Sequence, residues 1–258
     1  MPTFSVVTPS LNQGRFLRDC LESVRVAAAG AGVEVQHIVM DGGSSDETLE
    51  VLKHAPGIEW ESSPDRGQTD AINKGLAMAR GDVISYLCAD DLLEEEAFVF
   101  VKRAFAEMAN VDVVYGDAYF LESGWKRRKR AGEFSPARLR RGNFLLQPAV
   151  FWRRRVFERF GNLRADLRFC MDHEYWLRIS GNALWHYIPE PLASSRLHAD
   201  AKTWSQLVPA WDEARAMQAG YGIYWRPMRD AWWMRIVGCH FYRIKRHIIA
   251  AMARRRAS

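Results

Sequence analysis

Short apolar runs alternate with longer amphipathic runs over the first 115 residues. The apolar runs are rich in β-branched and aromatic residues and predict buried strands at residues 4–8, 33–40, 58–61, 83–87 and 112–115. Between them, apolar residues recur with helical spacing over residues 15–29, 45–54, 66–80 and 94–108. Strands that alternate with helices predict a mostly parallel sheet with right-handed crossovers. The expected fold class is therefore α/β, with a Rossmann-like central sheet flanked by helices.

The second half of the chain has a less regular pattern. A hairpin is predicted where residues 118–121 and 125–129 flank Ser123-Gly124. Extended segments are predicted at residues 148–152, 183–188 and 193–197, and helices at 155–160, 172–180 and 206–220. We expect one domain over residues 1–222, followed by a basic helical extension over residues 223–258.

Composition favours a folded protein in a reducing compartment. The chain has 258 residues, of which 48% are hydrophobic and 26% charged, so it can bury a full core. The cysteines (Cys20, Cys88, Cys170 and Cys239) have no C-x-x-C spacing, which argues against disulfides and a zinc site. The first predicted strand begins at Phe4, so no signal peptide is expected, and no apolar run reaches the ~20 residues of a membrane span. We expect a cytoplasmic protein.

The formal net charge of +5 is concentrated locally. From about residue 228 the chain has the pattern of a long helix with an apolar face (Val237, Phe241, Ile244, Ile248) opposite a basic face (Arg235, Arg243, Arg246, His247). This pattern is typical of an interfacial helix on anionic lipid, although a helix packed on the domain with a solvated basic face has it too. Residues 126–130 and 138–141 form a second basic cluster. Because no nucleic-acid motif accompanies these segments, we expect an anionic membrane surface rather than nucleic acid as the partner.

Acidic residues directly follow two of the predicted strands. Asp41 ends one strand, and Asp90 and Asp91 follow the strand at 83–87. Burying such acids is unfavourable unless a cation meets them, and open α/β sheets bind ligands at the carboxyl ends of their strands. We therefore expect Asp90-Asp91 to hold a divalent metal that in turn holds a phosphate. The absence of G-x-G-x-x-G and G-x-x-x-x-G-K-[ST] argues against an ordinary dinucleotide site or P-loop.

A series of motifs resembles the family 2 glycosyltransferases with the GT-A fold. In chain order these are Ser5-Val6-Val7-Thr8-Pro9-Ser10-Leu11-Asn12, Asp41-Gly42-Gly43-Ser44-Ser45-Asp46, Asp65-Arg66-Gly67 with Asp70-Ala71-Ile72-Asn73-Lys74-Gly75, Ala89-Asp90-Asp91, and Asp172-His173-Glu174-Tyr175-Trp176-Leu177-Arg178. The resemblance covers roughly residues 4–200. It implies transfer of a sugar from a nucleotide donor to a hydroxyl, with a nucleotide-sugar half at 1–117 and an acceptor half at 118–222.

The resemblance also implies which residues contact the donor. These are Thr8, Pro9, Ser10, Asn12, Asp41, Asp65, Arg66, Gly67, Asp70, Ala89, Asp90, Arg196 and Lys202. In the family, the residue that matches Asp41 accepts from the N3–H of uracil, which suits a carboxylate. Simpler structural explanations exist for some of them: the loop at 8–12 as a plain turn, Ser45 as a helix N-cap, and Asp70 as the partner of Lys74 in a surface ion pair.

The expected metal site departs from the family pattern. The usual motif is Asp-x-Asp, and Cys88 stands at the position of its first acid. Mg²⁺ and Mn²⁺ prefer oxygen to a thiol, but one carboxylate together with phosphates and water can suffice. The resemblance implies Asp90 as the metal ligand and His198 as a further ligand, with Asp91 as an additional possibility. A histidine in an ordinary loop is the alternative for His198.

The expected catalytic base is Asp172, with Glu174 as its competitor. Inverting sugar transfer needs a carboxylate that takes the proton of the acceptor hydroxyl, and the family has its base four positions before the residue matching Trp176. An acid at this place also suits the first turn of a helix.

The sequence as a whole thus predicts an inverting hexosyltransferase at the inner face of the plasma membrane. It would move a hexose or N-acetylhexosamine from a UDP-sugar to a saccharide or lipid-linked acceptor in bacterial surface polysaccharide or glycolipid synthesis, with Mn²⁺ or Mg²⁺. The first alternative is a catalytically weak, glycosyltransferase-like nucleotide-sugar binder, suggested by Cys88. The second is a basic scaffold associated with lipid or nucleic acid.

Overall fold

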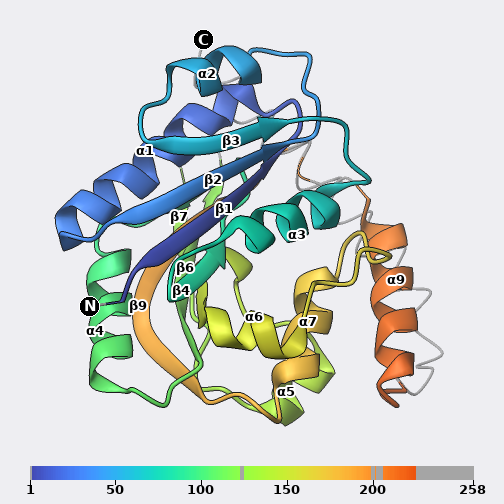
Figure 1. The fold of residues 1–258 in the computed structure, drawn as a ribbon. Helices are drawn as coiled ribbons and strands as arrows, with labels where there is room; N and C mark the ends of the chain where they lie inside the picture. The colour runs from blue at the N-terminus through green and yellow to red at the C-terminus, as the bar shows by residue number, and fades with distance from the viewer. Residues whose placement is uncertain (1, 123–124, 199–200, 202–205, 225–258) are drawn as a thin grey trace. The chain divides into compact units, whose positions relative to one another are not determined.

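The structure, a computed structural model, describes residues 2–122, 125–198, 201 and 206–224 (Figure 1). The chain divides into two compact units, residues 1–197 and 198–258. The first holds the sheet and its helices, and the second holds helix α9 (Leu207–Gly220). Most of the predicted basic extension, residues 225–258, lies outside the described residues, and the predicted domain limit at residue 222 stays a prediction. In the part of the chain that the structure describes, no helix is long and apolar enough to cross a membrane.

The first unit is built on one sheet with the strand order β3-β2-β1-β4-β8-β6-β9-β5, and β7 pairs with β6 (Figure 1). The strands are β1 (Phe4–Ser10), β2 (Val35–Asp41), β3 (Ile58–Ser62), β4 (Val83–Tyr86), β5 (Asp91–Leu93), β6 (Val113–Glu122), β7 (Trp125–Lys129), β8 (Val150–Arg153) and β9 (Trp185–Arg196). Neighbours among β1, β2, β3 and β4 are parallel, as are β6 and β9. β8 lies antiparallel between β4 and β6. The predicted α/β class with a mostly parallel sheet is confirmed.

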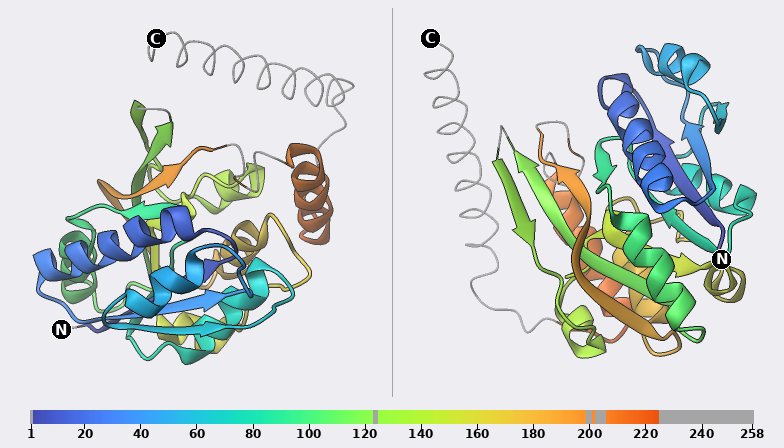
Figure 2. Two further views of the ribbon diagram at one scale, coloured as in Figure 1. Left: turned by 90° about the horizontal axis from the view of Figure 1, so that it is seen from above. Right: turned by 90° about the vertical axis from the view of Figure 1, so that its left-hand side faces the viewer.

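Helices cover both faces of this sheet (Figures 1 and 2). They are α1 (Gly14–Ala31), α2 (Thr48–His54), α3 (Gln68–Met78), α4 (Ala97–Glu107), α5 (Pro136–Arg141), the 3₁₀ turn η1 (Gln147–Ala149), α6 (Arg154–Phe160) and α7 (Met171–Ile179). Val6 of β1 shares a core cluster with Val24 of α1 and Phe98 of α4. Val7 faces the opposite side, against Gly75 of α3, where a Cβ would clash with it. The alternation along β1 thus separates the two helical layers.

Two strands extend further than their patterns predicted. β1 continues through Pro9 and Ser10, which pair with Met40 and Asp41 of β2 rather than forming an exit loop. The separate strands predicted at 183–188 and 193–197 are one strand, β9, which pairs with β6 across a register shift. Pro189 and Pro191 cannot donate to the ladder, and the strand continues past them through the register shift around Asp117.

The N-cap prediction for Ser45 was wrong. Helix α2 begins at Thr48, and the carboxylate of Asp46 accepts from the Thr48 backbone N–H at 3.0 Å. Asp46 also accepts from the Gly14 N–H at 3.0 Å, so one side chain serves the starts of α1 and α2. A Cβ at Gly14 would lie 2.7 Å from the Thr48 nitrogen, which explains why a glycine stands where the two helices meet.

Candidate functional site

The loop after β2 is organised around Asp41, a buried residue at the carboxyl end of its strand. Its Oδ2 accepts from the backbone N–H groups of Gly43 (3.2 Å) and Ser44 (2.9 Å) and from Ser62 Oγ (2.6 Å). Its Oδ1 accepts from Ser44 Oγ. An ionised carboxylate offers about four acceptor positions, so Oδ1 retains capacity for one more donor.

The loop after β1 is joined to the same structure. Asn12 has a left-handed φ of 53° and accepts from the Ser45 N–H at 2.8 Å. Its own N–H donates to Ser44 Oγ at 2.7 Å. These two bonds join the loops after β1 and β2 into one wall above the strand ends.

Within β1, the predicted donor-contact residues divide between the core and the strand end. Thr8 is fully buried, and its Oγ1 hydrogen-bonds to His37 Nε2 at 2.9 Å. Burial lowers the pKa of His37 to about 4, so this pair is neutral and belongs to the core. Pro9 continues the strand. Ser10 is buried at the strand end, and its Oγ has no hydrogen-bond partner among the described residues.

Asp65 and the start of α3 lie beside this wall. A Cβ at Gly42 would come within 2.7 Å of Asp65 Oδ2, so the missing side chain makes room for the acid. Asp65 Oδ1 accepts from the Gly67 N–H at 2.7 Å. Asp70 is engaged in ion pairs with Arg66 (2.9 Å) and Lys74 (3.3 Å).

The hydrogen bond from Arg66 is the main reason that the pKa of Asp70 falls to about 2. Asp70 therefore carries its charge throughout the physiological range and holds Arg66 in place. The Arg66 side chain itself is largely exposed at 84%, which leaves part of its guanidinium open to solvent.

The predicted metal site follows β4, and we call its residues Cys88, Asp90 and Asp91 the metal corner. Ligand atoms of Cys88, Asp90 and Asp91 all lie within 4.8 Å of one another. Ala89 is buried between them. A turn closed by the Asp91 N–H and the Cys88 carbonyl oxygen (2.9 Å) brings the three side chains together. Burial, and then the neighbouring charge of Asp90, raise the pKa of Asp91 well above its usual range.

This donor set fits a divalent cation. Two adjacent carboxylates, one of them buried, repel one another, and a cation would offset that repulsion. The Cys88 thiol contacts two amide side chains: Gln68 Nε2 lies 3.1 Å from Cys88 Sγ, and Gln147 Oε1 lies 3.9 Å from it.

Arg196 ends β9 beside the metal corner, since β9 pairs with β5 through Ser195 and Asp91. One of its terminal nitrogens donates to Asp19 at 2.7 Å, whereas the buried Nη1 has no partner among the described residues. His198 begins the second unit, and Lys202 lies outside the described residues.

Asp172, in the first turn of α7, is half-buried, and its Oδ2 accepts from Asn143 Nδ2 at 2.8 Å. Desolvation is the main reason that the pKa of Asp172 is raised, and its charge acts on Tyr86 at the end of β4. The position therefore lies close to the strand that leads to the metal corner.

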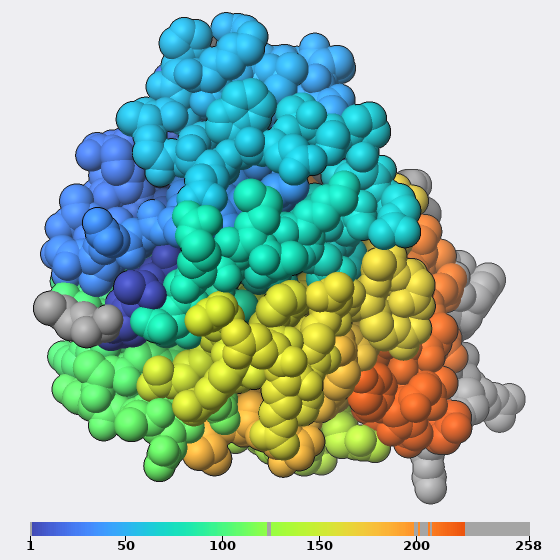
Figure 3. All heavy atoms as spheres, viewed as in Figure 1, coloured from blue at the N-terminus to red at the C-terminus, as the bar shows by residue number. Residues whose placement is uncertain are grey.

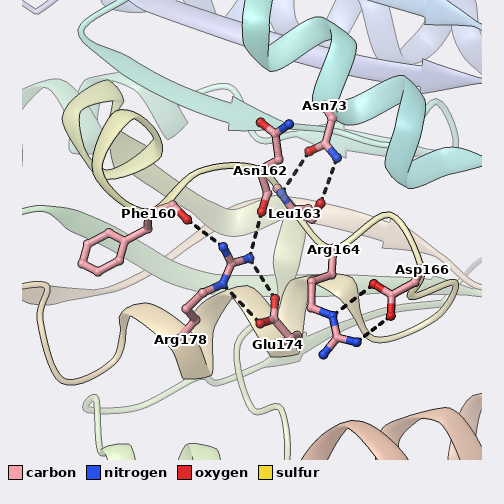
Figure 4. Close-up of polar contacts among 8 residues, drawn as sticks. All are labelled: Asn73, Phe160, Asn162, Leu163, Arg164, Asp166, Glu174 and Arg178. Atoms are coloured by element: carbon pink, nitrogen blue, oxygen red, sulfur yellow. Dashed lines mark hydrogen bonds and ion pairs between the residues drawn. The ribbon is translucent and has the colours of Figure 1, made fainter. Parts of the chain in front are cut away.

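Glu174 has a different environment from Asp172 (Figure 4). It is buried and forms a two-point ion pair with Arg178, with distances of 2.9 and 3.2 Å. Arg178 also donates to the carbonyl oxygens of Phe160 (2.7 Å) and Asn162 (2.9 Å). Arg178, which Glu174 of the same helix holds in place, thus joins α7 to the end of α6 and the segment after it.

The same segment is tied to α3. Asn73 donates to the Leu163 carbonyl oxygen (2.9 Å) and accepts from its N–H (3.0 Å), as Figure 4 shows. Thr69 Oγ1 donates to the Leu167 carbonyl oxygen at 2.9 Å. In Figure 3 the side chains of α3 (teal) and of residues 160–170 (yellow) lie against one another. The helix that begins at the donor side is therefore fixed relative to α7.

Sequence reasoning missed the residues that support these groups. These residues are ordinary polar residues in the sequence. Asn143 is 29 positions from Asp172. Gln68 and Gln147 are 20 and 59 positions from Cys88. No local pattern marks such pairs, because only the folded chain brings them together.

Comparison with known proteins agrees with this arrangement. The family model "Glycosyl transferase family 2" matches residues 5–178. A "PGL/p-HBAD biosynthesis glycosyltransferase" of Mycobacterium tuberculosis (strain ATCC 25177 / H37Ra) is 30% identical over 187 residues, which is 70% of this chain and 71% of that protein. An uncharacterised glycosyltransferase of the same species (strain CDC 1551 / Oshkosh) is 30% identical over 181 residues, covering 69% and 68%.

Two solved structures share the fold. Staphylococcus aureus TarS residues 1–349, in complex with UDP-GlcNAc, has a TM-score of 0.66 and 15% identity, over 83% of this chain and 65% of that chain. The mannosyltransferase PcManGT of Pyrobaculum calidifontis, with GDP-Man and Mn²⁺, has a TM-score of 0.65 and 14% identity, over 87% and 65%. The matched residues, the relatives and the fold agree with the resemblance found in the motifs. The chain is therefore a glycosyltransferase of family 2 with the GT-A fold.

Proposed function

We propose that this protein transfers a hexose or N-acetylhexosamine from a UDP-sugar to a hydroxyl of a saccharide or lipid-linked acceptor, with inversion at the anomeric carbon. The observation that carries the proposal is the arrangement of acids around the carboxyl ends of β2 and β4. The Asp41 loop, the Cys88–Asp91 corner and Asp172 gather there, each with its own set of partners.

The donor pocket would use the wall formed by the loops after β1 and β2. Asp41 Oδ1 can accept from a uracil N–H. Ser10, which pairs with Asp41 across β1 and β2, has an Oγ without a hydrogen-bond partner among the described residues. The wall would be supported by Asn12 and Thr8. The donor would also contact backbone groups of Pro9, Gly67 and Ala89. Asp65 would face the ribose. We assign the diphosphate to Arg66 and Lys202 and to the buried Nη1 of Arg196, because guanidinium groups pair well with phosphate oxygens.

Asp172 would act as the general base. In its ionised form it accepts the proton of the acceptor hydroxyl while that oxygen attacks the anomeric carbon. The Asn143 amide holds one carboxylate oxygen, which leaves the other oxygen for the acceptor. Glu174 is less suited to this step because its carboxylate is engaged by Arg178. A single displacement needs no covalent nucleophile.

We assign a divalent cation, Mn²⁺ or Mg²⁺, to Asp90, with Asp91 as a further ligand; His198 stays a ligand that only the resemblance to the family implies. When bound there, such an ion would stabilise the negative charge of the departing nucleoside diphosphate. The carboxylates of the corner suit this role, and a related fold was solved with Mn²⁺.

We further propose that the acceptor is presented at the inner face of the plasma membrane. The basic segment at residues 223–258 has the composition of an interfacial helix. The mycobacterial relative named above is assigned to the biosynthesis of PGL/p-HBAD. Both support a peripheral enzyme of cell-envelope synthesis that acts on a lipid-linked or saccharide acceptor.

The donor assignment can be tested by thermal shift with UDP, GDP, UDP-GlcNAc and GDP-mannose, each with and without Mn²⁺. A ligand that binds only the folded state raises apparent stability. We expect the UDP compounds to raise Tm more than the GDP compounds, and Mn²⁺ to increase the difference. A larger shift with GDP-mannose would assign a guanine nucleotide instead.

A second function, a nucleotide-sugar binder without turnover, is favoured by Cys88 alone. The thiol occupies the place where an acid would add to the charge of the metal corner. Tight binding of UDP in the absence of UDP release from any common UDP-hexose, with Mn²⁺ present, would establish the binder instead of the enzyme.

A further inference from the structure

The β6–β7 hairpin has two chemically different faces. Its cross-strand pairs include Glu122 with Trp125, Phe120 with Arg127 and Ala118 with Lys129, which alternate with Leu121–Lys126 and Tyr119–Arg128. Since successive side chains of a strand point to opposite faces, two sets result. We call the face that carries Trp125, Arg127 and Lys129 the outer face, and the face that carries Lys126 and Arg128 the inner face.

Cations of the inner face have structural partners. Lys126 pairs with Glu94 at 2.9 Å and lies over the ring of Tyr119. Arg128 pairs with Asp117 at 2.8 Å, and this fully buried acid also accepts from the hydroxyl of Tyr187 at 2.6 Å. These contacts fix the hairpin to the rest of the sheet, so the charges of the inner face are explained by the fold.

The cations of the outer face have weaker structural partners: Arg127 lies over the ring of Phe120, 5.8 Å from its centroid. Arg127 and Lys129 are exposed, and in the part of the chain that the structure describes neither forms an ion pair. Trp125 is 74% exposed, the largest fraction for a bulky apolar side chain among the described residues of the first unit. An indole beside exposed cations is the combination found where proteins meet the headgroup region of a bilayer.

The place of the hairpin relates this face to the site. β7 pairs with β6, β6 with β9, and β9 with β5, which begins at Asp91. Three strand spacings place β7 about 14 Å from β5. In Figure 2 (left) the hairpin (green) projects beyond the helices that flank the sheet. A flat surface can therefore reach the outer face without passing those helices.

We propose that the outer face of the β6–β7 hairpin docks on an anionic lipid bilayer, with Trp125 in the headgroup region and Arg127 and Lys129 against lipid phosphates. This inference goes beyond the proposed function, because it depends neither on the sugar nor on residues 223–258. Docking there would bring the metal corner close to hydroxyls carried by membrane lipids.

The test is co-sedimentation of the full chain with vesicles of phosphatidylcholine alone or mixed with phosphatidylglycerol, at about 0.1 M salt. The variant is Arg127→Glu/Lys129→Glu. Its control, Arg103→Glu/Arg159→Glu, makes the same change of net charge at exposed arginines that lie over Phe100 and Phe160. Each cation near an anionic surface contributes about fivefold to binding.

Loss of the two cations alone should lower partition to anionic vesicles about 25-fold, and the two added negative charges should lower it further, so we expect a loss of at least about 25-fold. The control should lose much less, and Trp125→Ala should lose severalfold on both vesicle types. Unchanged UDP affinity in all variants would show that the fold is intact. Because UDP affinity is measured without vesicles, it also separates a failure of this inference from a failure of the proposed donor.

Two results would overturn the inference. In the first, the hairpin variant and its control partition equally, which would leave membrane contact to other parts of the chain. In the second, Trp125→Ala has no effect, while the charge reversal lowers binding to soluble heparin as strongly as to vesicles. That outcome would assign the outer face to a soluble polyanion.

Discussion

At the scale of single residues, Asp172 and Glu174 show how environment separates two acids of one motif. Glu174 is buried and paired with Arg178, whereas Asp172 is half-buried and held by one neutral amide from Asn143. Desolvation raises the pKa of Asp172 and so favours its carboxylate as a proton acceptor, whereas the carboxylate of Glu174 is engaged by Arg178. The motif could be read from the sequence, but the choice between its acids depends on the partners that folding supplies.

The pH dependence of activity should reflect this environment. Desolvation raises the pKa of Asp172, and the Asn143 hydrogen bond lowers it. The base is active when ionised, so the acid limb of kcat/KM should lie above the ordinary aspartate pKa of about 3.9. Asn143→Ala removes the donor that stabilises the ionised form, and the limb should then move to higher pH. A limb that stays in place while kcat falls would give Asn143 a purely structural role.

Cys88 can be tested by restoring the missing acid. Cys88→Asp adds a hard oxygen ligand and a negative charge to the corner that holds Asp90 and Asp91. Since ligand charge and oxygen donors favour Mn²⁺ and Mg²⁺, we expect the activating Mn²⁺ concentration to fall by about tenfold. Cys88→Ser, which adds no charge, is the matched control and should change this concentration little. An unchanged requirement in Cys88→Asp would show that residue 88 does not approach the metal.

At the scale of elements, the sequence predicted most strands and helices because their periodicity is local. It split β9 in two and ended β1 too early, since prolines interrupt both patterns while sheet pairing with β6 and β2 continues through them. It did not predict α5 (Pro136–Arg141), a six-residue helix capped by Ser135. Such short elements are decided by caps and tertiary contacts rather than by an apolar stripe.

Stability of the α7 region should depend on the ion pair between Glu174 and Arg178. Glu174 is nearly fully buried, so Arg178→Ala leaves an uncompensated charge and also removes donors from two carbonyl oxygens. We expect a loss of about 3–5 kcal/mol in the free energy of unfolding, measured with urea. Arg25→Ala, which breaks an exposed pair with Glu22, should lower the free energy of unfolding much less than Arg178→Ala does. Equal losses in both variants would mean that the buried pair adds little.

At the scale of the whole molecule, the site is assembled from segments that are far apart in the chain. Asp41 ends β2, Asp65 and Asp90 follow β3 and β4, and Asp172 lies in the first turn of α7. The parallel order of β1 to β4 brings the strand ends to one edge of the sheet. The sequence could predict this gathering because the family motifs mark strand ends. It could not predict the ties that fix the parts, such as Asn73 to Leu163, which join segments 90 residues apart.

The central claim is that this site binds a nucleotide sugar and that Asp172 activates the acceptor. The most direct measurement compares UDP affinity and sugar transfer in the wild type and in Asp172→Asn, with Mn²⁺ present. We expect equal UDP affinity and a loss of transfer of about 10²–10⁴-fold in the variant. Full transfer in Asp172→Asn, or loss of transfer in Glu174→Gln with UDP affinity retained, would contradict the account.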